Sequence, residues 1–113
     1  MLRSIFNAAR NSLAGVAAAA RNEGSFQVEL AACAALLPLG LWLGGTGVER
    51  ALLVSSVLIV LCAELVNTAL EAAVDRISLE IHPLARRAKD IGSAAVMLAL
   101  VNAGVVWLLV LFS

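Results

Sequence analysis

The sequence predicts an all-α integral membrane protein, with three transmembrane helices and an N-terminal amphipathic helix on the membrane surface. Of its 113 residues, 62% are hydrophobic and only 14% are charged. The mean hydropathy is +0.97. A soluble domain of this length has too little interior to bury so much apolar surface. Three long segments carry almost no charge, and each is long enough to cross a bilayer as a helix.

The expected spans belong to a single membrane domain, residues 1–113. They are residues 26–47, 51–75 and 90–112. A helix needs about 20 apolar residues to cross ~30 Å of hydrocarbon, and backbone groups cannot stay unpaired in lipid. We therefore expect each span to be helical. The first span carries Pro38 and ends in glycines, whereas Glu64 and Glu71 are the charged residues between Ala51 and Val74 in the second.

The first 22 residues have the spacing of an amphipathic helix. Apolar side chains recur at helical intervals, at Leu2, Ile5, Phe6, Ala9, Leu13 and Val16. Arginine and asparagine fall on another side, which suits a helix that lies on the membrane surface. Three arginines without an acid also fit an organelle transit peptide, an alternative that we rank below the surface helix.

The basic residues predict the orientation of the chain. Seven of the eight lysines and arginines lie in the N-terminal segment or in the second connection, and only Arg50 lies in the first connection. By the positive-inside rule, the N-terminus and the second connection are cytoplasmic. The net charge is zero, with eight basic and eight acidic residues, which argues against a nucleic-acid binder.

Three features that can mark a site are interpreted as structural. Residues 44–47, Gly-Gly-Thr-Gly, lack the lysine and the strand-to-helix context of a phosphate loop, so we expect a turn. Cys33 and Cys62 lie in apolar segments without metal-ligand spacing, and we expect them to pack as small apolar residues. A repeat of Ala95, Ala99 and Ala103 on the third span favours close helix packing within or between subunits.

Polar side chains share one face of the second span. They are Glu64, Asn67, Thr68, Glu71 and Asp75, at steps of three, four and seven residues. The inner boundary is expected near Leu70, with Glu71 at the cytoplasmic interface and Glu64 about 9 Å deeper than Leu70. A carboxylate at that depth is unfavourable unless it is paired, protonated or hydrated. We therefore regard Glu64 as a functional candidate, with a merely structural polar residue as the alternative.

Two further groups of polar residues face the same side of the membrane. Asn22 and Glu23 precede the first span, and Lys89 and Asp90 precede the third. Such a collection suits phosphoryl transfer, because Mg²⁺ takes oxygen ligands, cations offset the phosphoryl charge, and a base accepts the proton of the acceptor hydroxyl. Composition and spacing alone leave two classes open: a lipid-modifying enzyme, and an ion- or proton-conducting membrane oligomer that uses Glu64.

A resemblance to one protein family favours the first of these two classes, the lipid-modifying enzyme. Residues 63–76, AELVNTALEAAVDR, resemble the signature of the prokaryotic diacylglycerol kinases, and residues 88–96, AKDIGSAAV, continue it at the family's spacing. Asn22-Glu23 followed by Phe26 is also similar to the family pattern. The resemblance covers nearly the whole chain, and its E-x-x-N-x-x-x-E-x-x-x-D core is highly specific.

The resemblance implies an ATP-dependent kinase that phosphorylates diacylglycerol to phosphatidic acid, with Mg²⁺ as its metal. It implies a homotrimeric helical bundle in the bacterial inner membrane, with three spans and one surface helix per subunit and an N-terminus in the cytoplasm. The active sites would be shared between neighbouring subunits at the cytoplasmic face. The partners would be the lipid, ATP and two further copies of the chain, with no nucleic acid.

The resemblance also assigns roles to residues. Glu64 would be the catalytic base at the lipid hydroxyl, Glu23 and Glu71 would hold the metal, and Asn67 would position Glu64 or the phosphate. Ser93 and the surface helix would line the lipid site. The implied ATP contacts are Asn11, Glu23, Asn67, Glu71, Glu80, His82, Lys89 and Asp90.

The chain departs from the family pattern in its first helices. Asn11 stands where members often carry an aromatic residue, and Ser4 and Gln27 replace frequent basic residues. Residues 82–85, HPLA, also resemble the related undecaprenol kinases, whereas residues 92–95, GSAA, are closer to the diacylglycerol branch. Undecaprenol therefore remains the alternative lipid substrate.

Overall fold

The computed structural model describes residues 1–22, 24–77 and 83–113, and these residues form helices without any strand. The helices are α1 (Leu2–Asn22), α2 (Gly24–Leu43), α3 (Gly47–Ile77) and α4 (Pro83–Phe112). Helices α2, α3 and α4 are long and apolar enough to cross a membrane. This confirms the predicted class, an all-helical protein with three candidate spans.

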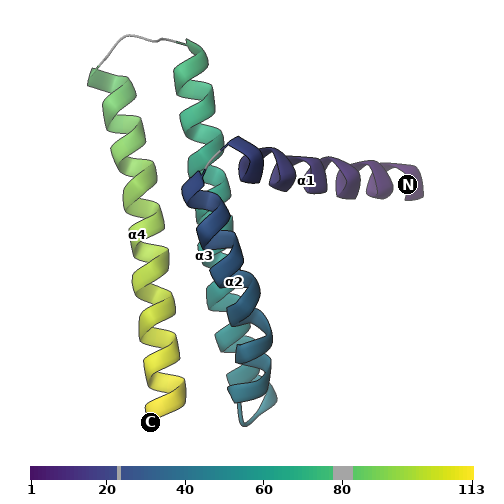
Figure 1. Ribbon diagram of the computed structural model, residues 1–113, viewed down its shortest axis with the longest axis vertical. Helices are drawn as coiled ribbons and strands as arrows, with labels where there is room; N and C mark the ends of the chain where they lie inside the picture. The colour runs from purple at the N-terminus through teal and green to yellow at the C-terminus, as the bar shows by residue number, and fades with distance from the viewer. Residues whose placement is uncertain (23, 78–82) are drawn as a thin grey trace.

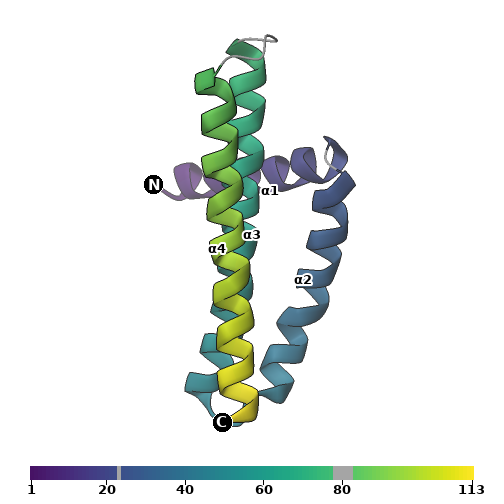
Figure 2. The same cartoon turned by 90° about the vertical axis from the view of Figure 1, so that its left-hand side faces the viewer.

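Helix α3 is the centre of the arrangement, because α2 and α4 both pack against it. Helix α1 projects sideways, nearly perpendicular to the other three (Figure 1). The C-terminal end of α3 and the N-terminal end of α4 extend past the level of α1, as the turned view also shows (Figure 2). The turn between α2 and α3 and the C-terminus lie at the opposite end.

The helices differ in length from the predicted spans. Helix α3 has 31 residues and α4 has 30, so each is about 45 Å long and exceeds the ~30 Å of a hydrocarbon core. The excess lies at the end where α1 projects (Figure 1). It carries Asp75 and Arg76 at the end of α3, and Arg86, Arg87 and Lys89 at the start of α4. Helix α2 ends at Leu43, four residues before the predicted boundary, because a turn begins there.

The short connection between α2 and α3 is a turn, as predicted, and side chains cap the helix that follows it. The Thr46 hydroxyl oxygen accepts a hydrogen bond from the backbone N–H of Glu49 (3.1 Å), and the Glu49 carboxylate accepts one from the N–H of Gly45 (2.8 Å). This arrangement resembles a capping box, with the N–H of Gly45 in place of the N–H of the N-cap residue Thr46, and it satisfies the N–H of Glu49 in the first turn of α3. At Gly44 a Cβ atom would lie 2.5 Å from the Cγ of Arg50, so a side chain does not fit there.

A small apolar core joins the three long helices. It consists of Cys33 from α2, Val57 and Val60 from α3, and Ala99 from α4. Ala103 packs against this core, whereas Ala95 is exposed. Two members of the alanine repeat therefore serve packing within the protomer. Cys33 is a buried free thiol, which agrees with its predicted role as a small apolar residue.

Large apolar side chains cover the outside of the long helices. Leu58, Ile59 and Val66 of α3 and Leu98 and Leu108 of α4 are each about half exposed or more. A water-soluble monomer does not present such a surface over its whole length. Lipid chains or another copy of the protein are the partners that suit it.

Hydrogen bonds reinforce the α3–α4 contact at the end near the C-terminus. The Trp107 indole N–H donates to the Ser56 hydroxyl oxygen (3.1 Å), and that hydroxyl donates to the Leu53 carbonyl (2.8 Å). Ser56 is 2% exposed, so its hydroxyl has little access to water. Gly40 of α2 makes room here, since a Cβ on it would lie 3.2 Å from the Cβ of Leu53.

We expect Trp107→Phe to destabilise the protein by about 1 kcal/mol, because it removes an interhelical hydrogen bond within the membrane. Reversible unfolding in mixed detergent micelles measures this change. The control is Trp42→Phe, since Trp42 is 79% exposed and the same substitution there leaves the α3–α4 contact intact. Equal stability of the two variants would contradict the structural role of the Trp107 bond.

Candidate functional site

The polar face of α3 begins with Glu64 deep in the bundle. Glu64 is an acidic residue of α3, yet it is buried, with 9% of its surface exposed. Its carboxyl group lies close enough to that of Glu29 in α2 to interact with it. One Glu29 oxygen, Oε2, is buried and has no hydrogen-bond partner within the described residues. The site therefore contains a second acid near the predicted base.

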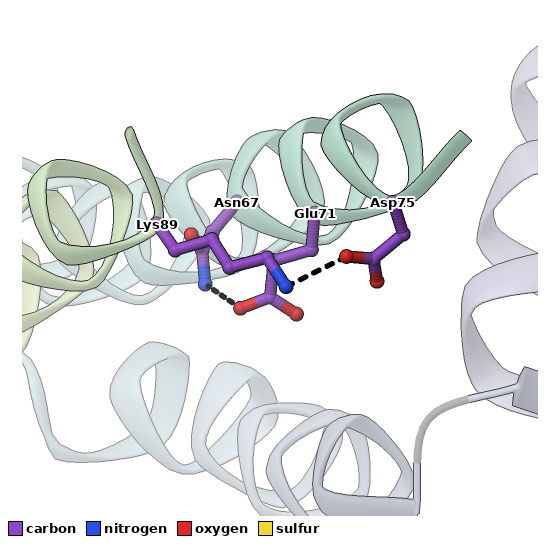
Figure 3. A network of polar contacts seen from close by, with 4 residues as sticks. All are labelled: Asn67, Glu71, Asp75 and Lys89. Carbon is purple, nitrogen blue, oxygen red and sulfur yellow. Dashed lines mark hydrogen bonds and ion pairs between the residues drawn. The ribbon is translucent and has the colours of Figure 1, made fainter. Parts of the chain in front are cut away.

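One helical turn further along α3, Asn67 contacts Glu71. The Asn67 side-chain amide donates a hydrogen bond from Nδ2 to Oε1 of Glu71, at 3.3 Å (Figure 3). Glu64, Asn67 and Glu71 follow one another at steps of three and four residues, which places them on one side of the helix. The bond holds one Glu71 oxygen in place at the end of the apolar segment.

At the next turn an ion pair joins α3 to α4. The Lys89 ammonium lies 2.6 Å from the Asp75 carboxylate (Figure 3). Lys89 precedes the uncharged segment 91–113, and the hydrogen bond to Asp75 raises the pKa of its amine above the ordinary value. The side chains are 41% and 58% exposed, so water screens the pair and it adds little to stability. The ion pair places the Lys89 ammonium beside Glu71.

A groove of about 610 Å³ runs between α1 and α3. Small α1 residues line one side, and the α3 side consists of Leu65, Thr68, Ala69, Glu71, Ala72 and Asp75. Ser12 of α1 lines the groove, whereas its neighbour Asn11, the predicted nucleotide contact, does not. The groove joins an apolar wall to two acids, which suits a molecule with an apolar body and a polar head.

The corner between α1 and α2 holds this wall in place. The Gln27 side-chain amide in α2 donates to the Ala20 carbonyl in the last turns of α1, at 2.5 Å. Phe26 is 1% exposed and Ala19 is 8% exposed, so both helices bury apolar side chains near their junction. Gln27, which departs from the family pattern, thus has a structural role at the corner.

The described acids fit a metal held jointly with a nucleotide. Within residues 1–22, 24–77 and 83–113, no three side chains of His, Cys, Asp or Glu are grouped to hold a metal ion. Mg²⁺ usually takes only one or two carboxylates together with phosphate oxygens and water. Glu71, with an oxygen held by Asn67, suits that kind of site and does not suit a cage made of protein ligands alone.

The other predicted site residues are less closely joined to this group. Asp90 and Ser93 lie on exposed parts of α4 in the protomer. Glu23, Glu80 and His82 lie outside the described residues. The contact of Glu29 with Glu64 was not predicted, because spacing along one helix says nothing about which residue of a neighbouring helix will face it.

Comparisons with known proteins point to one family. The family model described as "Prokaryotic diacylglycerol kinase" matches residues 10–111. "Diacylglycerol kinase" of Haemophilus influenzae is 45% identical over 111 residues, which covers 98% of this chain and 94% of that protein. Proteins of the same name are 43% identical in Escherichia coli and 44% identical in Pseudomonas aeruginosa. These two alignments cover 96% and 97% of this chain, and 89% of each relative.

Proposed function

The chain belongs to the prokaryotic diacylglycerol kinase family, and from this premise we propose that it transfers the γ-phosphoryl group of ATP to the free hydroxyl of diacylglycerol. The products are phosphatidic acid and ADP. The observation that carries the proposal is the full-length similarity to kinases of that name, together with the polar face of α3. Diacylglycerol is preferred to undecaprenol as the acceptor, because the similar proteins are named for it.

Glu64 is the proposed catalytic base. Its carboxylate accepts the proton of the lipid hydroxyl while the hydroxyl oxygen forms a bond to the γ-phosphorus and the bond from that phosphorus to ADP breaks. The proton then passes from Glu64 to water. The buried position of Glu64 supports this role, because a lipid hydroxyl arrives from the membrane and water competes less there. Glu29 lies beside it and can orient the carboxyl group.

Glu71 and Glu23 are the proposed metal ligands, and Lys89 is a proposed contact of the nucleotide. Mg²⁺ held by Glu71 and Glu23 would offset negative charge on the transferred phosphoryl group. The hydrogen bond from Asn67 supports the assignment of Glu71, since ligating carboxylates are commonly oriented by such partners. Asp90, Glu80, His82 and Asn11 remain proposed nucleotide contacts, and Ser93 a proposed lipid contact.

The groove between α1 and α3 is the proposed entry of the lipid. Its apolar wall suits acyl chains, and its acidic end lies along the same helix as Glu64. The end of the molecule with Arg76, Arg86 and Lys89 is proposed to face the cytoplasm, where ATP is available. The protein is thus proposed as a multi-pass protein of the bacterial inner membrane, with its N-terminus in the cytoplasm.

A homotrimer with shared sites is the proposed assembly. A bundle of three spans can hardly enclose ATP, a lipid and a metal while excluding water from the transfer. The exposed apolar side chains of α3 and α4 support contacts with further copies. Symmetric assembly repeats one interface, so a site between subunits recurs once per subunit.

Glu64→Gln should abolish transfer and leave the fold intact, because glutamine keeps the shape but cannot act as the base. General-base catalysis contributes roughly 10²–10⁴-fold, so the variant should retain less than about a tenth of the wild-type rate. Phosphatidic acid formation from ATP and diacylglycerol by purified protein measures this. Glu49→Gln is the matched control, since a glutamine at that position of a capping box is tolerated.

The same assay distinguishes the alternative functions. With undecaprenol offered at equal concentration, we expect the wild-type protein to phosphorylate diacylglycerol faster. A higher rate with undecaprenol would make undecaprenol the proposed substrate instead. Wild-type protein that forms no phosphorylated lipid from either acceptor would favour an ion- or proton-conducting oligomer instead.

Glu71→Gln should raise the Mg²⁺ concentration needed for half-maximal activity by about 10-fold or more, because it removes a charged oxygen ligand. Glu23→Gln should do the same. The experiment titrates activity with Mg²⁺ at a constant ATP concentration, again with Glu49→Gln as the control. An unchanged midpoint in both variants would exclude these two acids as metal ligands.

Mixed oligomers test whether sites are shared. Glu64→Gln and Glu23→Gln proteins are dissociated, mixed and reassembled, and a tag pull-down verifies mixed oligomers. Activity is measured at a Mg²⁺ concentration too low for Glu23→Gln alone to be active. Activity should return, because some interfaces receive an intact Glu64 from one chain and an intact Glu23 from another. Glu64→Gln mixed with Glu71→Gln is the control, since both residues lie on α3 and one chain supplies both. No recovery with Glu23→Gln would mean that each subunit carries a complete site.

A further inference from the structure

Gly92 of α4 lies against the side chain of Asn67. A Cβ atom at position 92 would overlap with the Asn67 amide oxygen and would also lie 3.0 Å from Cδ2 of Leu70. Gly104 on the same helix differs, since nothing lies within 4 Å of a Cβ built there. The space that a side chain would occupy at position 92 is thus filled by the Asn67 amide.

The contact with Gly92 is linked to the orientation of the Asn67 amide, that is, to which side its oxygen and its nitrogen take. Its oxygen Oδ1 is buried and has no hydrogen-bond partner within the described residues, while its nitrogen donates to Glu71. Only the nitrogen of an amide can donate to a carboxylate, so the oxygen must take the side that faces α4. The amide is planar, and the room left by Gly92 therefore lets the nitrogen point at Oε1 of Glu71.

Helix α4 contacts both neighbours of Glu71 on the polar face of α3. Gly92 lies against Asn67, one turn before Glu71, and Lys89 pairs with Asp75, one turn after it. Figure 3 shows Asn67, Glu71 and Asp75 in sequence along α3, with Lys89 reaching across from α4. The two contacts hold α4 at a fixed position along α3, beside the Glu71 carboxylate.

We infer that Gly92 is a positioning residue for the kinase reaction, because the absence of a side chain there keeps the Asn67 amide turned toward Glu71. The inference rests on the proposed function, in which Glu71 is a metal ligand. Any side chain at position 92 displaces the amide, breaks its bond to Glu71 and leaves the carboxylate without its orienting partner. Loss of such a partner weakens metal binding by about 10–100-fold in other metal sites.

The test compares Gly92→Ala with Gly104→Ala, its matched control on the same helix. Two measurements are made: the Mg²⁺ midpoint of activity, and direct Mn²⁺ binding by electron paramagnetic resonance with a non-hydrolysable ATP analogue. Gly92→Ala should weaken Mn²⁺ binding and raise the Mg²⁺ midpoint by about 10-fold. Gly104→Ala should leave both unchanged. Equal effects of the two variants would overturn the inference.

A double-variant cycle with Asn67→Ala separates positioning from packing. If Gly92 acts through Asn67, Gly92→Ala causes no further loss of Mn²⁺ binding in the Asn67→Ala protein. An equal loss in both backgrounds overturns the inference. If Gly92→Ala alone fails to assemble, the double variant is compared with Asn67→Ala: equal Mn²⁺ binding supports the inference, whereas weaker binding or failure to assemble shows that position 92 serves helix packing and overturns it. Glu71→Gln is measured in parallel. If it leaves Mn²⁺ binding unchanged, the proposed metal site fails, which is a different result from failure at Gly92.

Discussion

The packing of α4 against α3 is the contact on which the rest of this structure depends. Helices in a bilayer gain little from apolar burial against one another, since lipid chains are as apolar as the side chains, so close packing and hydrogen bonds hold them together. Close packing and polar interactions both occur along the α3–α4 contact. Trp107 and Ser56 share a hydrogen bond at one end, Val60 and Ala99 share the apolar core in the middle, and Lys89 and Asp75 pair at the other end.

The chemical groups lie where this contact leaves the apolar segments. Helix α3 is longer than a bilayer core requires, and its excess carries Glu71 and Asp75 toward water, whereas Glu64 stays buried. Helix α1 projects at the same end of the bundle (Figures 1 and 2) and forms the other wall of the groove. A kinase that takes ATP from water and its acceptor from the membrane needs such a boundary, because each substrate must reach the phosphoryl group from its own phase.

Much of the fold was predictable because a bilayer limits the choices. Segments of about 20 apolar residues must be helical there, so the spans followed from hydropathy, and the glycines at 44 and 45 correctly predicted a turn. The ends of the helices were less predictable. Helix α4 begins at Pro83, well before the predicted start of its span, since hydropathy reports the length of the apolar segment and not that of the helix.

For the site, the sequence by itself determined which side chains share the polar face of α3, because residues three and four apart on a helix must lie on one side. It also determined the family, through motifs that cover nearly the whole chain. Only the tertiary structure decided which partner each residue meets. Asn67 bonds Glu71, Glu64 lies beside Glu29, and Gly92 makes room for Asn67. The pairing of residues from different helices depends on the rotation and register of packed helices, which helical periodicity does not specify.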